Sequence, residues 1–277
     1  RGMKQAATPF LATILMLTSA SAWAAAETFQ ESRPIKGEKA LAVELALGTG
    51  EVRIEPGSFD KLFDVRAEVD PEILEPKARY GEGILSVYTL ARRKIGMPGT
   101  NRWTLSFTQK LPLTIHADLG AAKSDLDFTG LRLKDCTLLM GASLATLRFN
   151  TPNPIVLQHM RIEAGAANVQ GFGLGNSNFE TFEFKGGIGN SELDFAGDYR
   201  RKGQVKASVT VGRLIVRVPR SLGLRVKAAD GWASRVKLPP DLVQAEGHWV
   251  SPNYATAAGR LDVEAETRVG AIEITWE

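Results

Sequence analysis

The stretch GAAKSDLDFTGLRLKDCTLLMGASLATLRF, residues 120–149, contains one short pattern twice. GAAKSDLDF consists of a Gly-Ala pair, a polar segment and a Leu-x-Phe ending, and GASLATLRF repeats this layout from Gly141 onward. Such self-similarity is typical of solenoids, in which each unit buries its apolar face only by stacking on its neighbours. The stretch therefore predicts a stack of similar coils.

The corner glycine of this pattern returns along the chain at nearly even spacing, from Gly120 to Gly212. Glycine permits positive φ and a close approach of stacked backbones. We therefore expect a single-stranded parallel β-helix with about 21–25 residues per coil, right-handed because parallel crossovers generally are. The predicted turn glycines are Gly48, Gly120, Gly141, Gly165, Gly187, Gly212 and Gly270.

Apolar and polar residues alternate with period two through most of the chain after residue 40, as in LTIHADL and LDVEAE. This alternation is typical of strands that bury one face. No segment has the periodicity of a long amphipathic helix, so the sequence predicts an all-β protein. An antiparallel β-sandwich also consists of short alternating strands, and it remains the alternative fold.

The chain divides into a leader, a linker and one domain. Residues 1–24 combine Arg1 and Lys4 with an apolar run over 10–17 and the small-x-small site Ala22-Trp23-Ala24, which predicts a cleaved secretory signal peptide. We expect a linker over 25–40 and a single solenoid domain over 41–277, with irregular segments at about 71–103 and 231–259. The mature chain, without a transmembrane segment, is then expected in the periplasm or outside the cell.

Net charge and cysteine content limit the functions and cross-links that are possible. The net charge is +3, and two of the positive charges lie in the predicted leader. The mature chain therefore lacks the concentrated basic character that nucleic-acid binding needs. Cys136 is the only cysteine, which excludes an intramolecular disulfide and predicts a buried small hydrophobic residue in the run DCTLLM.

Several segments together resemble a known family. The G-x-[small]-x-[LV]-x-[VIF] rungs, VTVGRLIVRVPRSLGLRVKAADG and the ending SPNYATAAGRLDVEAETRVGAIEITW are similar to the toast-rack domains. These are auto-transporter adhesin head-domain-like proteins of the bacterial envelope, related to the C-terminal domain of the cell-wall-active-antibiotics-response regulators. The resemblance covers about residues 41–277. It implies a parallel β-solenoid with a role in adhesion, envelope sensing or protein–protein contact, and it provides no catalytic motif.

The carboxylates of SDLDF are the strongest catalytic candidates. Asp125 and Asp127 lie two residues apart and so share one face of a strand, and Glu192 and Asp194 repeat the arrangement in SELDF. Polysaccharide hydrolysis uses paired carboxylates. The corresponding positions in ATLRF, however, hold a threonine and an arginine. We therefore interpret these carboxylates as outward residues of a tolerant surface and expect no catalytic residue.

Other candidate sites are sparse. His116, His159 and His248 lie far apart without a ligand spacing, and alternation places His116 and His159 toward solvent. We expect neither a metal site nor a cofactor. Trp232, Trp249 and Tyr254 are the best candidates for a partner or glycan surface, or alternatively they cover the last coil.

These observations predict an exported, non-enzymatic β-solenoid that acts as an adhesin-like interaction or structural module of the bacterial cell envelope. Its expected partner is an envelope protein or a surface glycan, and not a nucleic acid. The alternative is a polysaccharide-active enzyme or a carbohydrate-binding β-helix protein.

Overall fold

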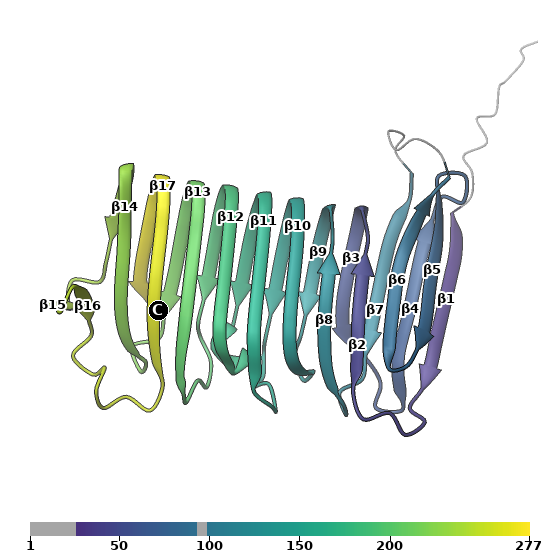
Figure 1. Ribbon diagram of the computed structural model, residues 1–277, viewed down its shortest axis with the longest axis horizontal. Helices are drawn as coiled ribbons and strands as arrows, with labels where there is room; N and C mark the ends of the chain where they lie inside the picture. Colours follow the sequence, from purple (N-terminus) through teal and green to yellow (C-terminus); the bar gives the residue numbers. More distant parts are fainter. Residues whose placement is uncertain (1–25, 93–98) are drawn as a thin grey trace, which may run out of the picture.

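A computed structural model describes residues 26–92 and 99–277, and for residues 230–232 the backbone alone. The strands stand side by side in one long open row, with the N-terminal strands at one end and β14 to β16 at the other (Figure 1). The 3₁₀ turn η1 (Leu174–Ser177) is the one helical element within these described ranges. The all-β prediction is confirmed. The predicted leader, 1–24, lies outside the described residues.

Strands occupy most of the chain. The N-terminal strands are β1 (Glu27–Pro34), β2 (Leu41–Ala46), β3 (Thr49–Pro56), β4 (Lys61–Val69), β5 (Leu74–Gly81), β6 (Ile84–Ala91), β7 (Asn101–Phe107), β8 (Pro112–Asp118) and β9 (Ala121–Asp127). The remaining strands are β10 (Arg132–Arg148), β11 (Leu157–Phe172), β12 (Phe179–Asp194), β13 (Lys202–Val218), β14 (Gly223–Lys237), β15 (Val243–Ala245), β16 (His248–Val250) and β17 (Arg260–Trp276).

Each coil has two arms that meet at a corner. In β10 the alternation of buried and exposed residues is interrupted after Met140, at Gly141 and the residue that follows it, and resumes in the opposite phase. A strand that bends there directs the inward side chains of both halves toward each other. We call the half before the corner the first arm and the half after it the second arm. In the early coils the two arms are separate strands, β2 with β3 and β8 with β9.

The two arms enclose a continuous apolar core. Leu138 in the first arm of β10 and Leu147 in its second arm are both fully buried, and the same arrangement recurs from coil to coil. Burying one such side chain contributes roughly 1.5–3 kcal/mol. Cys136 belongs to this core, where burial raises the pKa of its thiol. Its predicted role as a buried hydrophobic residue is confirmed.

Neighbouring coils pair in parallel, as the solenoid prediction requires. First arms follow the order β6–β2–β8–β10–β11–β12–β13–β17–β14, and second arms follow β7–β3–β9–β10 and then the same order. Antiparallel pairs occur at the ends: β1–β4–β7 and β5–β6 at one, β14–β16–β15 at the other. The right-handed coiling stays a prediction.

The ends of the stack include the segments predicted to be irregular. The described residues of segment 71–103 include the β5–β6 hairpin and the start of β7, and segment 231–259 contains β15 and β16. The range 25–40, predicted as a linker, holds β1, which pairs with β4 from Glu27 to Pro34. Its sequence ETFQESRP buries little, so hydrophobic alternation could not reveal it.

The last strand is inserted out of chain order. β17 pairs in parallel with β13 on one side and with β14 on the other, so coils that follow each other in the chain are not adjacent there. This differs from the sequential stack that the glycine spacing predicts. The chain forms β14, passes through the β15–β16 hairpin and returns between two earlier coils, where both edges of β17 find partners.

The corner glycines form two columns rather than one. Gly141 donates its backbone N–H to the carbonyl of Gly120 at 2.7 Å, and Gly165 and Gly187 continue this column. Gly212 stacks instead on Gly189, and Gly270 stacks on Gly212. The step from Gly187 to Gly212 therefore crosses from one column to the other, because the true equivalent of Gly212 in β12 is Gly189. The single predicted phase is wrong at this point.

One buried asparagine, Asn153, hydrogen-bonds to backbone groups of two neighbouring coils. The Asn153 side-chain amide donates to the carbonyls of Leu133 at 2.8 Å and Ser177 at 3.2 Å, and its oxygen accepts from the Leu133 N–H at 3.0 Å. Three backbone polar groups, two of Leu133 and one of Ser177, thereby have a partner. Asn153 thus connects successive coils.

We predict that Gly212→Ala destabilises the protein far more than Gly48→Ala. Gly212 has φ +139°, and an added Cβ would lie 1.8 Å from the Gly189 carbonyl oxygen, whereas a Cβ on Gly48 would meet nothing within 4 Å. The expected loss in free energy of unfolding is on the order of 3 kcal/mol for Gly212→Ala and below about 1 kcal/mol for Gly48→Ala. Urea unfolding followed by tryptophan fluorescence measures both. Equal losses would contradict the close approach at this corner.

Candidate functional site

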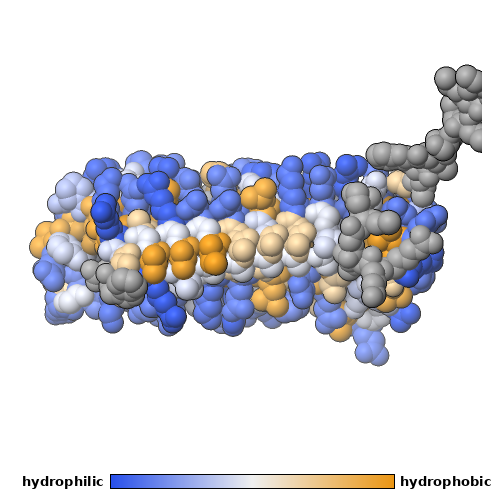
Figure 2. All heavy atoms as spheres, turned by 90° about the horizontal axis from the view of Figure 1, so that it is seen from above, coloured by the Kyte–Doolittle hydropathy of each residue, from blue (hydrophilic) through white to orange (hydrophobic). Residues whose placement is uncertain are grey.

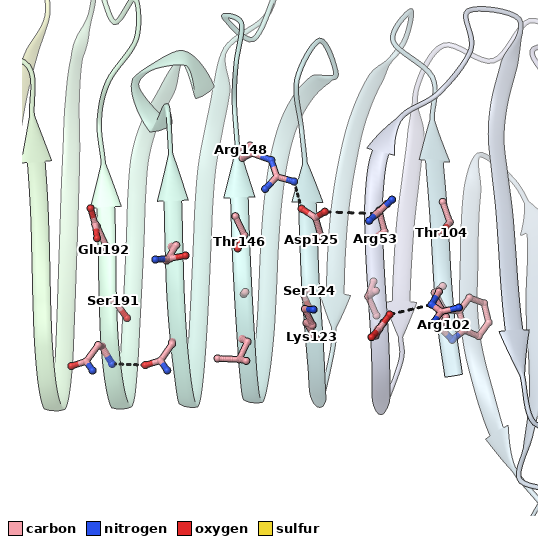
Figure 3. Close-up of a pocket in the computed structure, with 18 of the residues that line it drawn as sticks. Arg53, Arg102, Thr104, Lys123, Ser124, Asp125, Thr146, Arg148, Ser191 and Glu192 are labelled. Carbon is pink, nitrogen blue, oxygen red and sulfur yellow. Dashed lines mark hydrogen bonds and ion pairs between the residues drawn. The ribbon is translucent and has the colours of Figure 1, made fainter. Parts of the chain in front are cut away.

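A groove crosses the outer face of the second arms. It encloses about 760 Å³ and is lined by residues of β7, β3, β9, β10, β11, β12 and β13, and Figure 3 shows its side chains on adjacent parallel strands. Because outward residues of stacked strands lie in register, the lining forms two rows along the stack. One row is Glu51, Lys123, Leu144, Asn168, Asn190 and Arg213, and the other is Arg53, Asp125, Thr146, Gln170, Glu192 and Ile215.

Ion pairs occupy the end of the groove nearest the N-terminal strands. The Asp125 carboxylate is paired with the Arg148 guanidinium and lies 3.7 Å from Arg53 (Figure 3). Arg102 approaches Glu51 at 3.1 Å. The hydrogen bond and positive charge of Arg102 hold the pKa of the Glu51 carboxyl below its usual range.

The opposite end of the groove is also ion-paired. Glu192 in β12 accepts a hydrogen bond from Arg217 at 2.5 Å, and Arg213 in β13 is paired with Glu273 of β17. Side-chain hydrogen bonding and the charge of Glu192 raise the pKa of Arg217. Charged groups at both ends are thus largely neutralised within the protein.

The middle of the groove has a different character. The side chains of Thr146, Gln170 and Asn190 have no hydrogen-bond partner among the described residues. The Asn168 side-chain oxygen accepts the Asn190 backbone N–H at 3.0 Å, and its amide N–H groups have no partner among the described residues. Leu144, 58% exposed, adds an apolar surface. This part of the site therefore offers unused donors and acceptors beside an aliphatic side chain.

The carboxylates singled out in the sequence lie on this outer surface. Asp127 and Asp194 accept the backbone N–H groups of Thr129 at 3.0 Å and Ala196 at 2.9 Å, and so stabilise turns. Asp125 in β9 and Glu192 in β12 are separated by β10 and β11. The two carboxylate pairs are therefore not brought together, and Thr146 and Arg148 lie beside Asp125 and Asp127 as the alternation predicts.

The predicted aromatic surface lies elsewhere, at the C-terminal end. Trp249 is 39% exposed on β16, opposite Val226 of β14. Tyr254 is half-buried, with the Arg225 guanidinium 5.3 Å from its ring centre. The side chain of Trp232 lies outside the described residues. Neither Trp249 nor Tyr254 lines the groove, and whether they bind a partner stays a prediction.

Tyr254 belongs to a charged network that attaches the last loop to the stack. Its hydroxyl donates to the Asp262 carboxylate, which also accepts from Arg225 at 2.7 Å and lies 3.2 Å from Lys202. Burial alone would raise the pKa of Asp262, but these hydrogen bonds outweigh it and lower that pKa. Burial, followed by the bond to Asp262, raises the pKa of Tyr254 to about 12.

Two of the histidines and the adjacent basic residues Arg200 and Arg201 have ordinary surface positions. His116 and His159 are exposed, as alternation predicts, and His159 lies 3.1 Å from Asp135. Arg200 and Arg201 pair with Asp198 and Glu180. Across residues 26–92 and 99–277, no group of three His, Cys, Asp or Glu side chains could hold a metal ion.

A narrow apolar row follows the corner of the solenoid (Figure 2). Ile188, Val211 and Val269 are 63%, 39% and 38% exposed, and Ala142 and Ala166 continue the row. The row is one side chain wide and follows the glycine corners. The groove is broader and chemically more varied, and we take it as the candidate site.

Sequence reasoning missed this groove. The alternation correctly marked Asp125, Thr146 and Arg148 as outward residues, but Gln170 and Asn190 carried no motif. The sequence held one partial indication of their position. Gln170 follows the corner glycine Gly165 and Asn190 follows Gly187, so both lie in the second arm of their coils.

Comparison with known protein families gives a match. A family model described as the N-terminal domain of toast_rack, DUF2154, matches residues 24–170, more than half of the chain. No match was found among curated proteins. In the part of the chain that the structure describes, no helix has the length and apolar character needed to cross a membrane.

The solved structures that match this chain include two bacterial proteins of low sequence identity. One is a "putative cell adhesion protein" from Clostridium sporogenes, with 18% identity and a TM-score of 0.45, covering 91% of this chain and 100% of that one. Another is a "putative adhesin" from Parabacteroides merdae, with 9% identity and a TM-score of 0.40, covering 90% and 96%.

We predict that Tyr254→Phe destabilises the protein by about 1–2 kcal/mol at neutral pH, because it removes a hydrogen bond to a charged group. The pKa of Asp262 is lower in the folded protein than in the unfolded chain, where it is about 4. The ionised carboxylate therefore stabilises the fold above about pH 4, and this stabilisation is lost as the pH falls through the pKa of the folded state. Because Tyr254 contributes to that lowering, the cost of the substitution should shrink below about pH 4.

Urea unfolding at pH 7 and at pH 3 measures both effects. Tyr88→Phe is the matched control, since the Tyr88 hydroxyl has no hydrogen-bond partner among the described residues, and it should cost little at either pH. A Tyr254→Phe cost that is the same at both pH values would contradict the coupling to Asp262.

Proposed function

The chain belongs to the toast-rack family, and we propose that it acts as an adhesin-like, non-enzymatic interaction module of the bacterial cell envelope. In this proposal the protein is exported by the leader predicted over residues 1–24, and it acts in the periplasm or outside the cell. The solenoid presents the groove on its second arms to an envelope partner.

The groove is the observation that carries this proposal. Its floor consists of strands whose backbone groups pair on both sides, for example β10 with β9 and β11, and β12 with β11 and β13. A floor of this kind holds outward side chains in fixed rows. Pre-organised side chains lose little freedom on binding, which favours recognition of an extended partner.

The charge pattern of the groove supports binding rather than chemistry. General acid catalysis needs a carboxyl group whose pKa is raised toward the working pH, whereas the pKa of Glu51 is lowered by Arg102. Asp125 is enclosed between Arg53 and Arg148. These ion pairs suit side chains that maintain the shape of the surface.

We predict that the purified protein cosediments saturably with isolated cell envelopes of the source bacterium. Thr146→Arg should weaken this binding about tenfold or more, because a long charged side chain fills the middle of the groove. Thr181→Arg is the matched control: Thr181 is also half-buried and faces outward, but it lies on the first arm of β12, outside the groove.

Sedimentation of labelled protein over a concentration series, at low and at 0.5 M salt, measures these affinities. Absence of saturable binding by the unchanged protein would overturn the proposed function. Equal weakening by the two arginine substitutions would show that the groove is not the surface involved.

A further inference from the structure

We propose that the groove binds a linear, uncharged polysaccharide, which lies along the stack of coils across β3 and β9 to β13. This inference rests on the proposed function, because it names the class of the envelope partner. It also transfers the predicted glycan surface from the C-terminal aromatic residues to the second arms.

The shape of the groove suits an extended chain. Its lining residues come from seven consecutive strands of one sheet, β7 to β13 by way of β3 and β9. Neighbouring strands lie about 4.8 Å apart, so the lined stretch is roughly 30 Å long. Equivalent side chains recur at each step along the two rows, and a polymer with a short repeat can meet such rows with several of its units.

The free polar groups of the groove match sugar hydroxyls. A hydroxyl both donates and accepts hydrogen bonds, and an Asn or Gln side chain offers both functions in one plane. Gln170, Asn190 and Thr146 lie on three adjacent strands and have no side-chain partner among the described residues. They can therefore bind a ligand without breaking a hydrogen bond within the protein.

The charges of the groove favour an uncharged polymer over an acidic one. Arg53, Arg102, Arg148 and Arg213 each have a carboxylate partner within 4.0 Å. Lys123 is the one charged lining residue without an ion pair within the described parts of the chain, and Glu51 contributes an opposite charge beside it. A polyanion would thus find a single free cation.

An extended peptide fits this surface less well. Peptides that bind sheets gain most of their affinity by adding a strand to an unpaired edge. The groove lies on a sheet face, where β10, β11 and β12 are paired on both sides. Leu144 and Ile215 offer instead aliphatic contacts, which suit the C–H faces of sugar rings.

The test is a binding panel on the full-length protein. The neutral probes are dextran, laminarin, galactomannan, hydroxyethylcellulose and chitohexaose, and polygalacturonate is the acidic comparison. Affinity electrophoresis screens the polymers, and titration calorimetry measures chitohexaose and any polymer that retards the protein. We expect at least one neutral probe to bind. Its affinity should be the same in 0.5 M salt, because an uncharged ligand forms no ion pair with the protein that salt could screen.

The variant Gln170→Ala with Asn190→Ala should weaken this binding about tenfold to a hundredfold, as two lost hydrogen bonds predict. Gln204→Ala is the matched control, since Gln204 is an exposed outward residue of the first arm of β13 and should leave binding unchanged. Circular dichroism and thermal unfolding verify that the variants fold.

Three results would overturn the inference: no neutral probe binds, polygalacturonate binds more tightly than every neutral probe, or the double variant binds like the unchanged protein. Its failure is distinguishable from failure of the proposed function. The protein could cosediment with envelopes in a way that Thr146→Arg weakens, and yet bind no neutral probe. That result would support an envelope module whose partner is not a neutral glycan. Binding to a neutral probe without envelope cosedimentation rejects the envelope role alone.

Discussion

Backbone hydrogen bonds join neighbouring coils at the glycine corners. There the Gly141 N–H donates to the Gly120 carbonyl at 2.7 Å, and the Ala121 N–H donates to the Gly48 carbonyl at 2.8 Å. A Cβ added at Gly120, Gly141 or Gly212 would lie 2.0, 2.8 or 1.8 Å from a backbone carbonyl oxygen of the neighbouring coil. Because each coil is held this closely to the previous one, residues at equal distance from the corner lie side by side. The core and the outer rows both depend on this register.

The groove is a consequence of the same register. Outward residues such as Thr146, Gln170 and Glu192 are separated by a full coil of chain, yet they occupy adjacent strands because their coils are in phase. Ion pairs between coils, including Asp125 with Arg148, neutralise the charged ends of the rows. The neutral middle is therefore the part of the surface most available for a ligand.

The two ends of a stack of parallel strands must also be covered, because an unpaired edge can pair with another chain. The N-terminal end continues into the antiparallel strands β1, β4 and β7 and the β5–β6 hairpin. At the C-terminal end, β15 and β16 cover part of β14. Tyr254 and Asp262 attach the intervening loop to β17, which explains an aromatic residue in a segment that breaks the repeat.

The sequence by itself determined the all-β class, the glycine corners from Gly48 to Gly187, the burial of Cys136 and the outward direction of Asp125 and His159. These follow from local constraints: alternation decides which face a residue occupies, and glycine marks a close approach. The tertiary structure alone decided that β17 lies between β13 and β14, that Gly212 pairs with Gly189, and that Gln170 and Asn190 share a groove. Strand neighbours are chosen through backbone hydrogen bonds, which are nearly the same for every sequence, so alternation cannot reveal which coil lies next to which.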